Sequence, residues 1–295
     1  MIKLKIRIIN APSDLGVSID GASLGPEILK KHFKNNKNID KIIDVECDCS
    51  NKSYDKNDLE KNLYKINDFS KRLYNTLLNN KGNSIITITV GGDHSIAISS
   101  VLASVKKEKK LGIIWIDTHP DFNTFETTLT GNIHGLPLAT ITDNNGYILT
   151  KFHDGNFIKN ENTVIIGARD TDKLEQVNLN NAKIKVFTTN DIKEKNIKEI
   201  VDYAIKKALK DTNGIHVSID IDVLDPLTAP GVSVSCKNGI TKQQLFEIID
   251  NVLLHKDKIK SFDVVEFNPA KDIDNKTENI AVEIINKIIN CYKEK

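Results

Sequence analysis

The sequence carries no surplus of either charge, no long hydrophobic run and few cysteines. Its 295 residues include 41 Lys and Arg against 40 Asp and Glu, which gives a formal net charge of +1. A chain this close to neutrality has no electrostatic field to hold a polyanion, so nucleic acid is not expected as a partner. No stretch approaches the roughly 18 consecutive apolar residues of a membrane-spanning helix. The first nine residues are too few and too charged for a signal-peptide core. We therefore expect no membrane partner and a cytoplasmic location.

The four cysteines are too few for a disulfide framework in a chain of this length. Cys47 and Cys49 are two positions apart and could form a metal pair. No second motif with zinc spacing follows them, so we interpret them as two side chains on the same side of a strand end.

Short apolar runs alternate with lysine-rich helical segments along the whole chain. The predicted strands are Lys5–Asn10, Ile42–Val45, Ser84–Val90, Leu111–Ile116, Thr163–Gly167, Ile184–Phe187, Ile215–Ile219 and Ile259–Val265. Several are continuous apolar runs, as expected for strands covered on both faces. The predicted helices are Pro26–Phe33, Leu59–Asn79, His94–Lys107, Ile197–Leu209, Thr241–His255 and Lys276–Lys293, and Thr241 and Gln244 have the spacing of a capping box. The pattern predicts a single α/β domain over residues 1–295, with three α/β/α layers and a mostly parallel sheet of about eight strands.

Acidic residues and histidines follow five of the predicted strands. Ligands bind at the carboxyl ends of the strands in open parallel sheets, so these segments are candidates for a functional site. One Asp at a strand end is an ordinary turn residue, but five strand ends with such residues predict a common site. The segments are Gly91–Ser95, Asp117–Asp121, Ala168–Asp172, Asp220–Asp222 and Glu266–Pro269.

Two of these segments place potential metal ligands two positions apart, so in an extended chain their side chains point to one side. An isolated Asp-x-Asp would be a solvated turn or a helix cap. The combined set has four carboxylates and two imidazoles, which exceeds the needs of one metal and suits two cations that share carboxylates. The oxygen-rich mixture favours Mn²⁺ over a structural zinc, while Fe, Co and Ni are also compatible. The residues are His94, Asp117, His119, Asp121, Asp220 and Asp222.

Three motifs resemble the metal signatures of the ureohydrolase family: GGDHS at Gly91–Ser95, DTHPD at Asp117–Asp121 and SIDIDVLDP at Ser218–Pro226. The segment Asn123–Gly135 resembles the bacterial-type arginase branch of that family. Ala11–Gly16, Gly25–Pro26 and Glu266–Pro269 are similar to arginases as well. The similarity extends from about residue 5 to residue 290. It implies an arginase-like fold and cleavage of L-arginine to L-ornithine and urea.

The resemblance implies two Mn²⁺ ions per subunit. One would be bound by His94, Asp117, Asp121 and Asp220, and the other by Asp117, His119, Asp220 and Asp222, with Asp117 and Asp220 bridging. A hydroxide between the ions would attack the guanidinium carbon, which is resonance-stabilised and a poor electrophile. By the same resemblance, Asp121 would transfer a proton to the leaving amine, Glu266 would hydrogen-bond the guanidinium and His134 would shuttle protons to bulk water.

The resemblance also assigns residues to the amino-acid end of the substrate. Asn123 and Thr130 would contact the α-carboxylate, and Asn132 belongs to the same substrate-binding loop. Asp172 would pair with the α-ammonium, with Glu175 behind it through water. Neutral donors for a carboxylate and a carboxylate for an ammonium are what an α-amino acid requires.

The sequence departs from the family in the segment Ser233–Ser235, where arginases commonly have Gly-Thr-Pro, and Thr130 stands where Ser is frequent. Two alternatives stay open, and the Ser233–Ser235 change supports only the first of them. One is a hydrolase for another guanidino compound, such as agmatine or 4-guanidinobutyrate. The other is a non-catalytic metal-binding homologue. The resemblance also implies a homo-oligomer, either a trimer or a hexamer.

Overall fold

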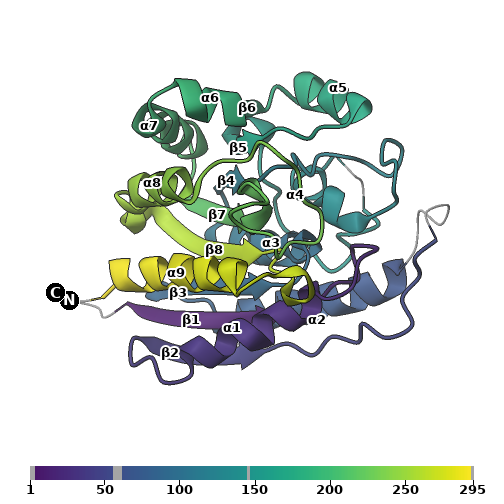
Figure 1. Cartoon of the computed structure of the whole chain (residues 1–295), viewed down its shortest axis with the longest axis vertical. Coiled ribbons are helices and arrows are strands. Elements are labelled where there is room, and N and C mark those ends of the chain that lie inside the picture. The colour runs from purple at the N-terminus through teal and green to yellow at the C-terminus, as the bar shows by residue number, and fades with distance from the viewer. Residues whose placement is uncertain (1–3, 56–61, 145–146, 294–295) are drawn as a thin grey trace.

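The computed structural model describes residues 4–55, 62–144 and 147–293. Every strand pairing among these residues is parallel, and the eight strands form one sheet in the order β2-β1-β3-β8-β7-β4-β5-β6 (Figure 1). The strands are β1 (Lys5–Ala11), β2 (Ile39–Asp44), β3 (Ile85–Gly91), β4 (Gly112–Ile116), β5 (Thr163–Ala168), β6 (Lys185–Thr188), β7 (Ile215–Asp220) and β8 (Ile259–Val265).

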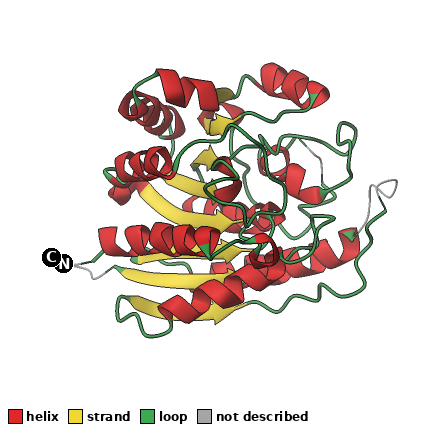
Figure 2. Ribbon diagram, in the orientation of Figure 1, coloured by secondary structure: helices red, strands yellow, loops and turns green. Residues whose placement is uncertain are grey.

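Helices cover both faces of the sheet, which gives the three-layer α/β/α fold (Figure 2). One hydrophobic core lies between the sheet and α1, α6, α7, α8 and α9, and the other contains residues of α2, α3, α4 and α5. The α-helices are α1 (Gly25–Phe33), α2 (Leu63–Asn80), α3 (Ala97–Glu108), α4 (Pro137–Ile141), α5 (Lys173–Ala182), α6 (Thr189–Glu194), α7 (Ile197–Ala208), α8 (Lys242–Leu253) and α9 (Lys276–Cys291).

Strand β4 shows why a continuous apolar run is needed. Ile113 and Trp115 lie in one core while Ile114 and Ile116 lie in the other, and all four are fully buried. Successive side chains of a strand point to opposite faces, so a strand between two helical layers must be apolar at every position. The prediction of a parallel sheet covered on both faces is confirmed.

The helices differ more from the sequence pattern than the strands do. The pattern did not predict α4, α5 or α6, and His94–Ile96 forms a separate 3₁₀ turn before α3. Residues 59–61, the predicted start of the second helix, lie outside the described residues. The capping box at the start of α8 is confirmed, because Gln244 Oε1 accepts from the Thr241 N–H at 2.9 Å and Thr241 Oγ1 accepts from the Gln244 N–H at 3.2 Å. Within the described ranges, no helix combines the length and the apolar character that crossing a membrane requires.

The strand order brings the five predicted functional segments together. β3, β8, β7, β4 and β5 are consecutive in the sheet, and because they are parallel their carboxyl ends lie at the same edge. The chain leaves β3 for β4 and later returns to fill the space between them with β7 and β8. A crevice at such a change of direction is where open α/β sheets bind ligands.

Candidate metal centre and substrate cleft

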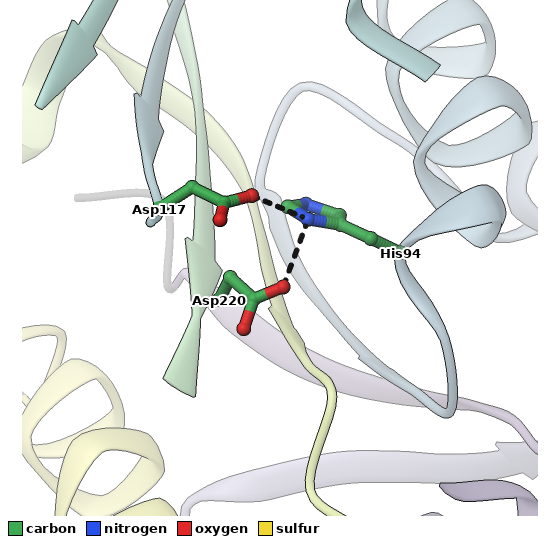
Figure 3. A group of neighbouring side chains, drawn as sticks. All are labelled: His94, Asp117 and Asp220. Carbon is green, nitrogen blue, oxygen red and sulfur yellow. Dashed lines mark ion pairs between the residues drawn. The ribbon is translucent and has the colours of Figure 1, made fainter. Parts of the chain in front are cut away.

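Three side chains from three different strands converge on one point at this edge of the sheet (Figure 3). His94 follows β3, Asp117 directly follows β4 and Asp220 is the last residue of β7. His94 Nδ1 lies 3.0 Å from Asp117 Oδ2 and 3.2 Å from Asp220 Oδ2. Asp121 Oδ2 also lies 3.2 Å from the same nitrogen. Each of these four side chains is buried.

The geometry around His94 Nδ1 fits a shared cation. Its other ring nitrogen, Nε2, lies 2.9 Å from Ser218 Oγ, while Nδ1 is buried and makes no hydrogen bond within the described part of the chain. Three carboxylate oxygens around an imidazole lone pair repel it unless a positive charge lies between them. Ligand atoms bound at about 2.0–2.2 Å to one ion lie about 3 Å apart when adjacent, which matches the observed separations.

A second group of ligand atoms shares Asp117 with the first. Asp117, His119 and Asp222 bring potential ligand atoms within 4.8 Å of one another. His119 Nδ1 lies 3.0 Å from Asp222 Oδ2 and 3.8 Å from Asp117 Oδ1. The two oxygens of Asp117 therefore face different histidines, Oδ2 toward His94 and Oδ1 toward His119. A carboxylate in this position is suited to bridge two cations. Asp117 Oδ1 also accepts the His119 N–H at 2.7 Å, and Asp220 is held in the same way, because its Oδ1 accepts the Asp222 N–H at 2.7 Å.

The buried carboxylates of the cluster carry negative charges that bound cations would neutralise. Burial and the neighbouring carboxylates raise the pKa of Asp117 and of Asp220. Burial alone would lower the pKa of His94, but the surrounding carboxylates outweigh it and raise that pKa. Asp222 lies beside His119, which lowers its pKa to about 2 although burial opposes ionisation. Oxygen and imidazole ligands without a thiolate favour Mn²⁺ or another hard to borderline divalent ion.

Two residues outside the predicted ligand set hold the first group in place. The indole of Trp115 stacks on the His94 ring at 3.9 Å between centroids, and its Nε1–H donates to Asp117 Oδ2 at 2.9 Å. Ser218 holds His94 Nε2 and lies 3.4 Å from Asp263 Oδ2. Both residues stand two positions before a predicted ligand on a strand, so their side chains point to the same face of the sheet. That spacing was the available signal.

Arg169 holds the backbone that carries the second group. Its guanidinium donates to five carbonyl oxygens at 2.8–3.2 Å, those of Asp222, Val223, Leu224, Cys236 and Lys237. Thr118 adds a hydrogen bond from its hydroxyl to the Asp222 carbonyl at 2.6 Å. The planar guanidinium can satisfy several acceptors at fixed angles, so Arg169 fixes the turn after β7. Gly167 stands close by with φ +109°, and a Cβ there would lie 2.4 Å from Val223 Cγ2.

Asp121 and Glu266 have left-handed backbone conformations, with φ of 52° and 66°. Such values are uncommon for residues other than glycine and are often found at functional sites. The Asp121 carbonyl accepts from Leu138 N at 3.0 Å and Ala139 N at 3.3 Å at the start of α4. Glu266 N donates to the Gly92 carbonyl at 2.7 Å. These bonds hold both side chains toward the site.

Glu266 and His134 lie against each other beside the metal cluster. His134 Nδ1 is 2.9 Å from Glu266 Oε1, which also accepts the His94 N–H at 2.9 Å. The second carboxylate oxygen, Oε2, is buried and has no hydrogen-bond partner among the residues that the structure describes. Burial alone would lower the pKa of His134, but the charge of Glu266 outweighs it and the pKa is raised.

A cleft of about 180 Å³ opens beside the cluster, and the predicted substrate-binding residues lie around it. All five predicted substrate-binding residues line it, together with His119, Asp121 and His134. Val234, from the segment that departs from the family pattern, also lines the cleft. The five predicted residues are Asn123, Thr130, Asn132, Asp172 and Glu175.

Glu175 is tied to Asp172 directly. It is the third residue of α5, and its Oε2 accepts the Asp172 N–H at 3.2 Å while Oε1 accepts the Phe122 N–H at 2.7 Å. Burial raises the pKa of Glu175 to about 7. Asn123 Nδ2 donates to Asp172 Oδ2 at 3.1 Å. The start of α5, a helix that the sequence pattern does not predict, therefore positions Asp172 in the cleft.

Comparison with known proteins agrees with this geometry. The family model described as "Arginase family" matches residues 4–291. The chain is 35% identical to an arginase of Staphylococcus aureus, with 97% of each chain covered. The arginase structure of Bacillus caldovelox has a TM-score of 0.89 at 30% identity and 99% coverage of both chains. An Entamoeba histolytica arginase, solved in complex with L-ornithine, has a TM-score of 0.90 at 27% identity and covers 98% of this chain and 99% of its own.

Proposed function

Because the chain belongs to the arginase family of hydrolases, we propose that it cleaves L-arginine with water to L-ornithine and urea, using two Mn²⁺ ions per subunit. The observation that supports this most strongly is the position of Asp117, whose two oxygens face two separate histidines. Relatives named arginase support the substrate, as does the L-ornithine found in the Entamoeba histolytica enzyme.

The ligands that we propose are the six predicted from the sequence. His94, Asp117, Asp121 and Asp220 would hold one ion, and Asp117, His119, Asp220 and Asp222 the other. The ions, when bound, would lower the pKa of a water molecule so that hydroxide is available near neutral pH to attack the guanidinium carbon. The carboxylates also offset the positive charge that a cationic substrate would otherwise meet.

Glu266 would orient the guanidinium group. Its Oε1 is held by His94 N and His134 Nδ1, and its buried Oε2 is left without a partner in the described residues. An unpaired buried carboxylate oxygen is costly, and a guanidinium N–H would satisfy it with a charge-assisted hydrogen bond.

Asp121 and His134 would move protons. Asp121 lines both the cluster and the cleft, so it can accept a proton during attack and return it to the amine as the C–N bond breaks. His134 lines the same cleft, with 15% of its side chain exposed. It can therefore exchange protons between the cleft and bulk water.

The polar residues around the cleft would read the amino-acid end of the substrate. Asn123 and Thr130 are proposed to donate to the α-carboxylate, and Asn132 supports the loop that holds Thr130 through the contact of its N–H with Thr130 Oγ1 at 3.1 Å. Asp172 would pair with the α-ammonium. Glu175 holds Asp172 from behind.

One observation supports a second candidate function, the hydrolysis of another guanidino compound. Val234 lines the cleft where the family pattern is altered, and an apolar side chain there changes the surface that the substrate meets. An experiment on this chain should therefore compare several guanidino substrates and not only measure activity on L-arginine.

Urea release by the metal-loaded chain tests the proposal. The protein would be stripped with a chelator, reloaded with Mn²⁺ and given L-arginine, agmatine and 4-guanidinobutyrate in parallel. The proposal expects L-arginine to be the best substrate and activity to depend on the metal. Preference for either analogue would favour the second candidate, and no urea from any of them would favour a non-catalytic metal-binding protein.

A cytoplasmic location, one domain over residues 1–295 and assembly into a trimer or hexamer complete the proposal. These rest on composition and on the family resemblance. Sedimentation of the purified chain would test the assembly.

A further inference from the structure

Cys47 and Cys49, which the proposed hydrolysis does not use, lie with their sulfur atoms 3.4 Å apart. We propose that this pair is a thiol–disulfide exchange site, at which a small-molecule disulfide oxidises the two thiols to an intramolecular Cys47–Cys49 disulfide. Both side chains are partly exposed, so a small oxidant can reach them. Cys236 and Cys291 instead contact the carbonyls of Lys237 and Leu253.

The backbone around the pair can adapt to the bond. Residues 45–49 follow β2 without regular secondary structure, so closing the ring breaks no ladder of strand hydrogen bonds there. A disulfide bond is about 2.05 Å long, so the two sulfur atoms would need to approach by little more than 1 Å. This shift is small for an irregular segment.

The two thiols are not equivalent. The Cys47 S–H can donate to the Cys49 sulfur, which lowers the pKa of Cys49 against the opposing effect of burial, and the Asp14 N–H lowers it further. The same hydrogen bond, together with burial, raises the pKa of Cys47. Asp14 and Asp93 face the pair and oppose ionisation, but Lys52 Nζ lies 3.1 Å from Asp14 Oδ1 and offsets part of that charge. We assign Cys49 as the attacking thiol and Cys47 as the resolving thiol, because Cys49 donates its S–H to the Pro12 carbonyl at 3.6 Å and so leaves Cys47 as the donor to the Cys49 sulfur.

The exchange proceeds in two balanced steps. The Cys49 thiolate attacks one sulfur of the small disulfide, which forms a mixed disulfide and releases one small thiolate. Cys47 then loses its proton to that thiolate, attacks the Cys49 sulfur and expels the second small group as a thiolate, which takes up the proton that Cys49 had released to water. Two protein thiols are oxidised, and one small disulfide is reduced to two thiols.

A series of contacts connects the cysteine pair to the metal centre, so oxidation of the pair can affect the metal ligands. Cys49 Sγ contacts the Pro12 carbonyl at 3.6 Å, and the next residue, Ser13, accepts the Asp93 N–H at 2.7 Å through its carbonyl. Asp93 directly precedes His94, and a Cβ on Gly92 would lie 1.9 Å from the Ser13 carbonyl oxygen. Pro12 and Ser13 are thus in tight contact with the segment that carries His94. Oxidation removes the thiol donor from the Pro12 carbonyl and loosens this support.

Mass spectrometry of one peptide tests the exchange site. Trypsin cleaves after Lys41 and Lys52, so residues 42–52 form a peptide that contains both cysteines. After incubation with excess glutathione disulfide and blocking with N-ethylmaleimide, we expect this peptide to carry no label and to be lighter than the dithiol by two hydrogen atoms. A peptide that still carries two labels would overturn the proposal. The reading depends on neither metal nor hydrolysis, so it stands or fails separately from the proposed function.

Single variants test the order of the steps. Cys47→Ser removes the resolving thiol, so Cys49 should accumulate a stable mixed disulfide with glutathione. Cys49→Ser should form the corresponding adduct on Cys47 more slowly. Cys236→Ser is the matched control and should oxidise at the 47–49 pair like the unaltered chain. An adduct that forms faster on Cys47 would reverse the roles, and no adduct on either residue would reject the site.

The link to His94 needs a separate measurement. We expect the oxidised chain to lose Mn²⁺ to a chelator several-fold faster than the reduced chain. A Cys47→Ser, Cys49→Ser double variant should lose it at one rate in both conditions. Equal rates for the oxidised and reduced unaltered chain would reject the link.

Discussion

The Asn123 side-chain amide donates a hydrogen bond to the Asp172 carboxylate, with 3.1 Å between Nδ2 and Oδ2. These residues are proposed to read opposite charges on the substrate, the α-carboxylate and the α-ammonium. The two groups stand on the same carbon of an amino acid, so their partners must be neighbours. The contact therefore suits a cleft that recognises an α-amino acid and not merely a guanidinium.

Substrate choice tests this pairing. Asp172→Ala should lower kcat/KM for L-arginine by about tenfold to a hundredfold, because a hydrogen bond to a charged group contributes roughly 1.5–3 kcal/mol. The loss should be much smaller for 4-guanidinobutyrate, which has no ammonium group. Urea release from the two substrates, measured with both proteins, checks the difference. Equal losses would mean that Asp172 mainly supports the start of α5.

Substitutions of Asp220 and of His134 should have different effects on metal binding and on activity. Asp220→Asn removes a charged ligand beside His94 Nδ1, so bound Mn²⁺ and kcat should both fall by orders of magnitude. His134→Asn should keep the metal and lose less activity, because water or buffer can replace a proton shuttle in part. Metal content by mass spectrometry and urea release, with imidazole added to the His134 variant, separate the two roles. A fully active Asp220→Asn would contradict the bridging assignment.

The strands could be predicted because each must be apolar on both faces, and the five functional segments followed from their positions at strand ends. Strand β2 was the least accurate, since the predicted Ile42–Val45 begins three residues after the observed start at Ile39. Helix α5 was missed because its apolar residues form no stripe. Leu174 and Val177 are about half exposed, while the polar Glu175 is buried. Arg169 could not be found in this way, because its five carbonyl partners lie 53 to 68 positions away along the chain and no local pattern encodes such contacts.

Arg169 should be sensitive even to a conservative change. Lysine offers one ammonium in place of a planar group with five N–H donors, so Arg169→Lys cannot reach the same five carbonyls. We expect lower thermal stability and several-fold weaker Mn²⁺ binding, because the Asp222 turn is released. Thermal unfolding and chelator competition measure the two effects. Arg72→Lys is the control, because Arg72 makes only an exposed helical ion pair with Asp68 among its described ion pairs. Equal effects of the two variants would contradict the role of Arg169.

Lys81 lies away from the metal centre, and we expect it to make the stability of the fold depend on pH. Its ammonium contacts the hydroxyls of Thr87, Ser104 and Ser261 at 2.8–3.1 Å, and burial lowers its pKa to about 8 from 10.5. Between these values the unfolded chain binds more protons than the folded chain, so this group makes the free energy of unfolding rise with pH.

The test compares the free energy of unfolding of the unaltered chain with that of a variant as the pH changes. Denaturant unfolding of the unaltered chain and of Lys81→Met should give a stability difference that shifts in favour of the unaltered chain between about pH 8 and 10.5. Lys107→Met, at an exposed position of α3, should give a flat difference over the same range. A flat curve for Lys81→Met would show that its pKa is not lowered.

Trp115 is expected to act on the metal through Asp117. Trp115→Phe keeps an aromatic ring against His94 but removes the Nε1–H that holds Asp117 Oδ2 at 2.9 Å. Loss of a hydrogen bond that orients a ligand typically weakens metal binding by about 10–100-fold, and that is the change we expect in chelator competition. The variant also leaves a small cavity, so its stability should fall as well. Phe262→Leu on β8 is the matched control, because Phe262 is also buried but belongs to the other hydrophobic core, where it contacts Tyr292. That variant should lose stability and keep its affinity for Mn²⁺. If both variants keep it, the indole serves only to fill the core, and the orientation of Asp117 must come from the His119 N–H, which donates to Oδ1 at 2.7 Å.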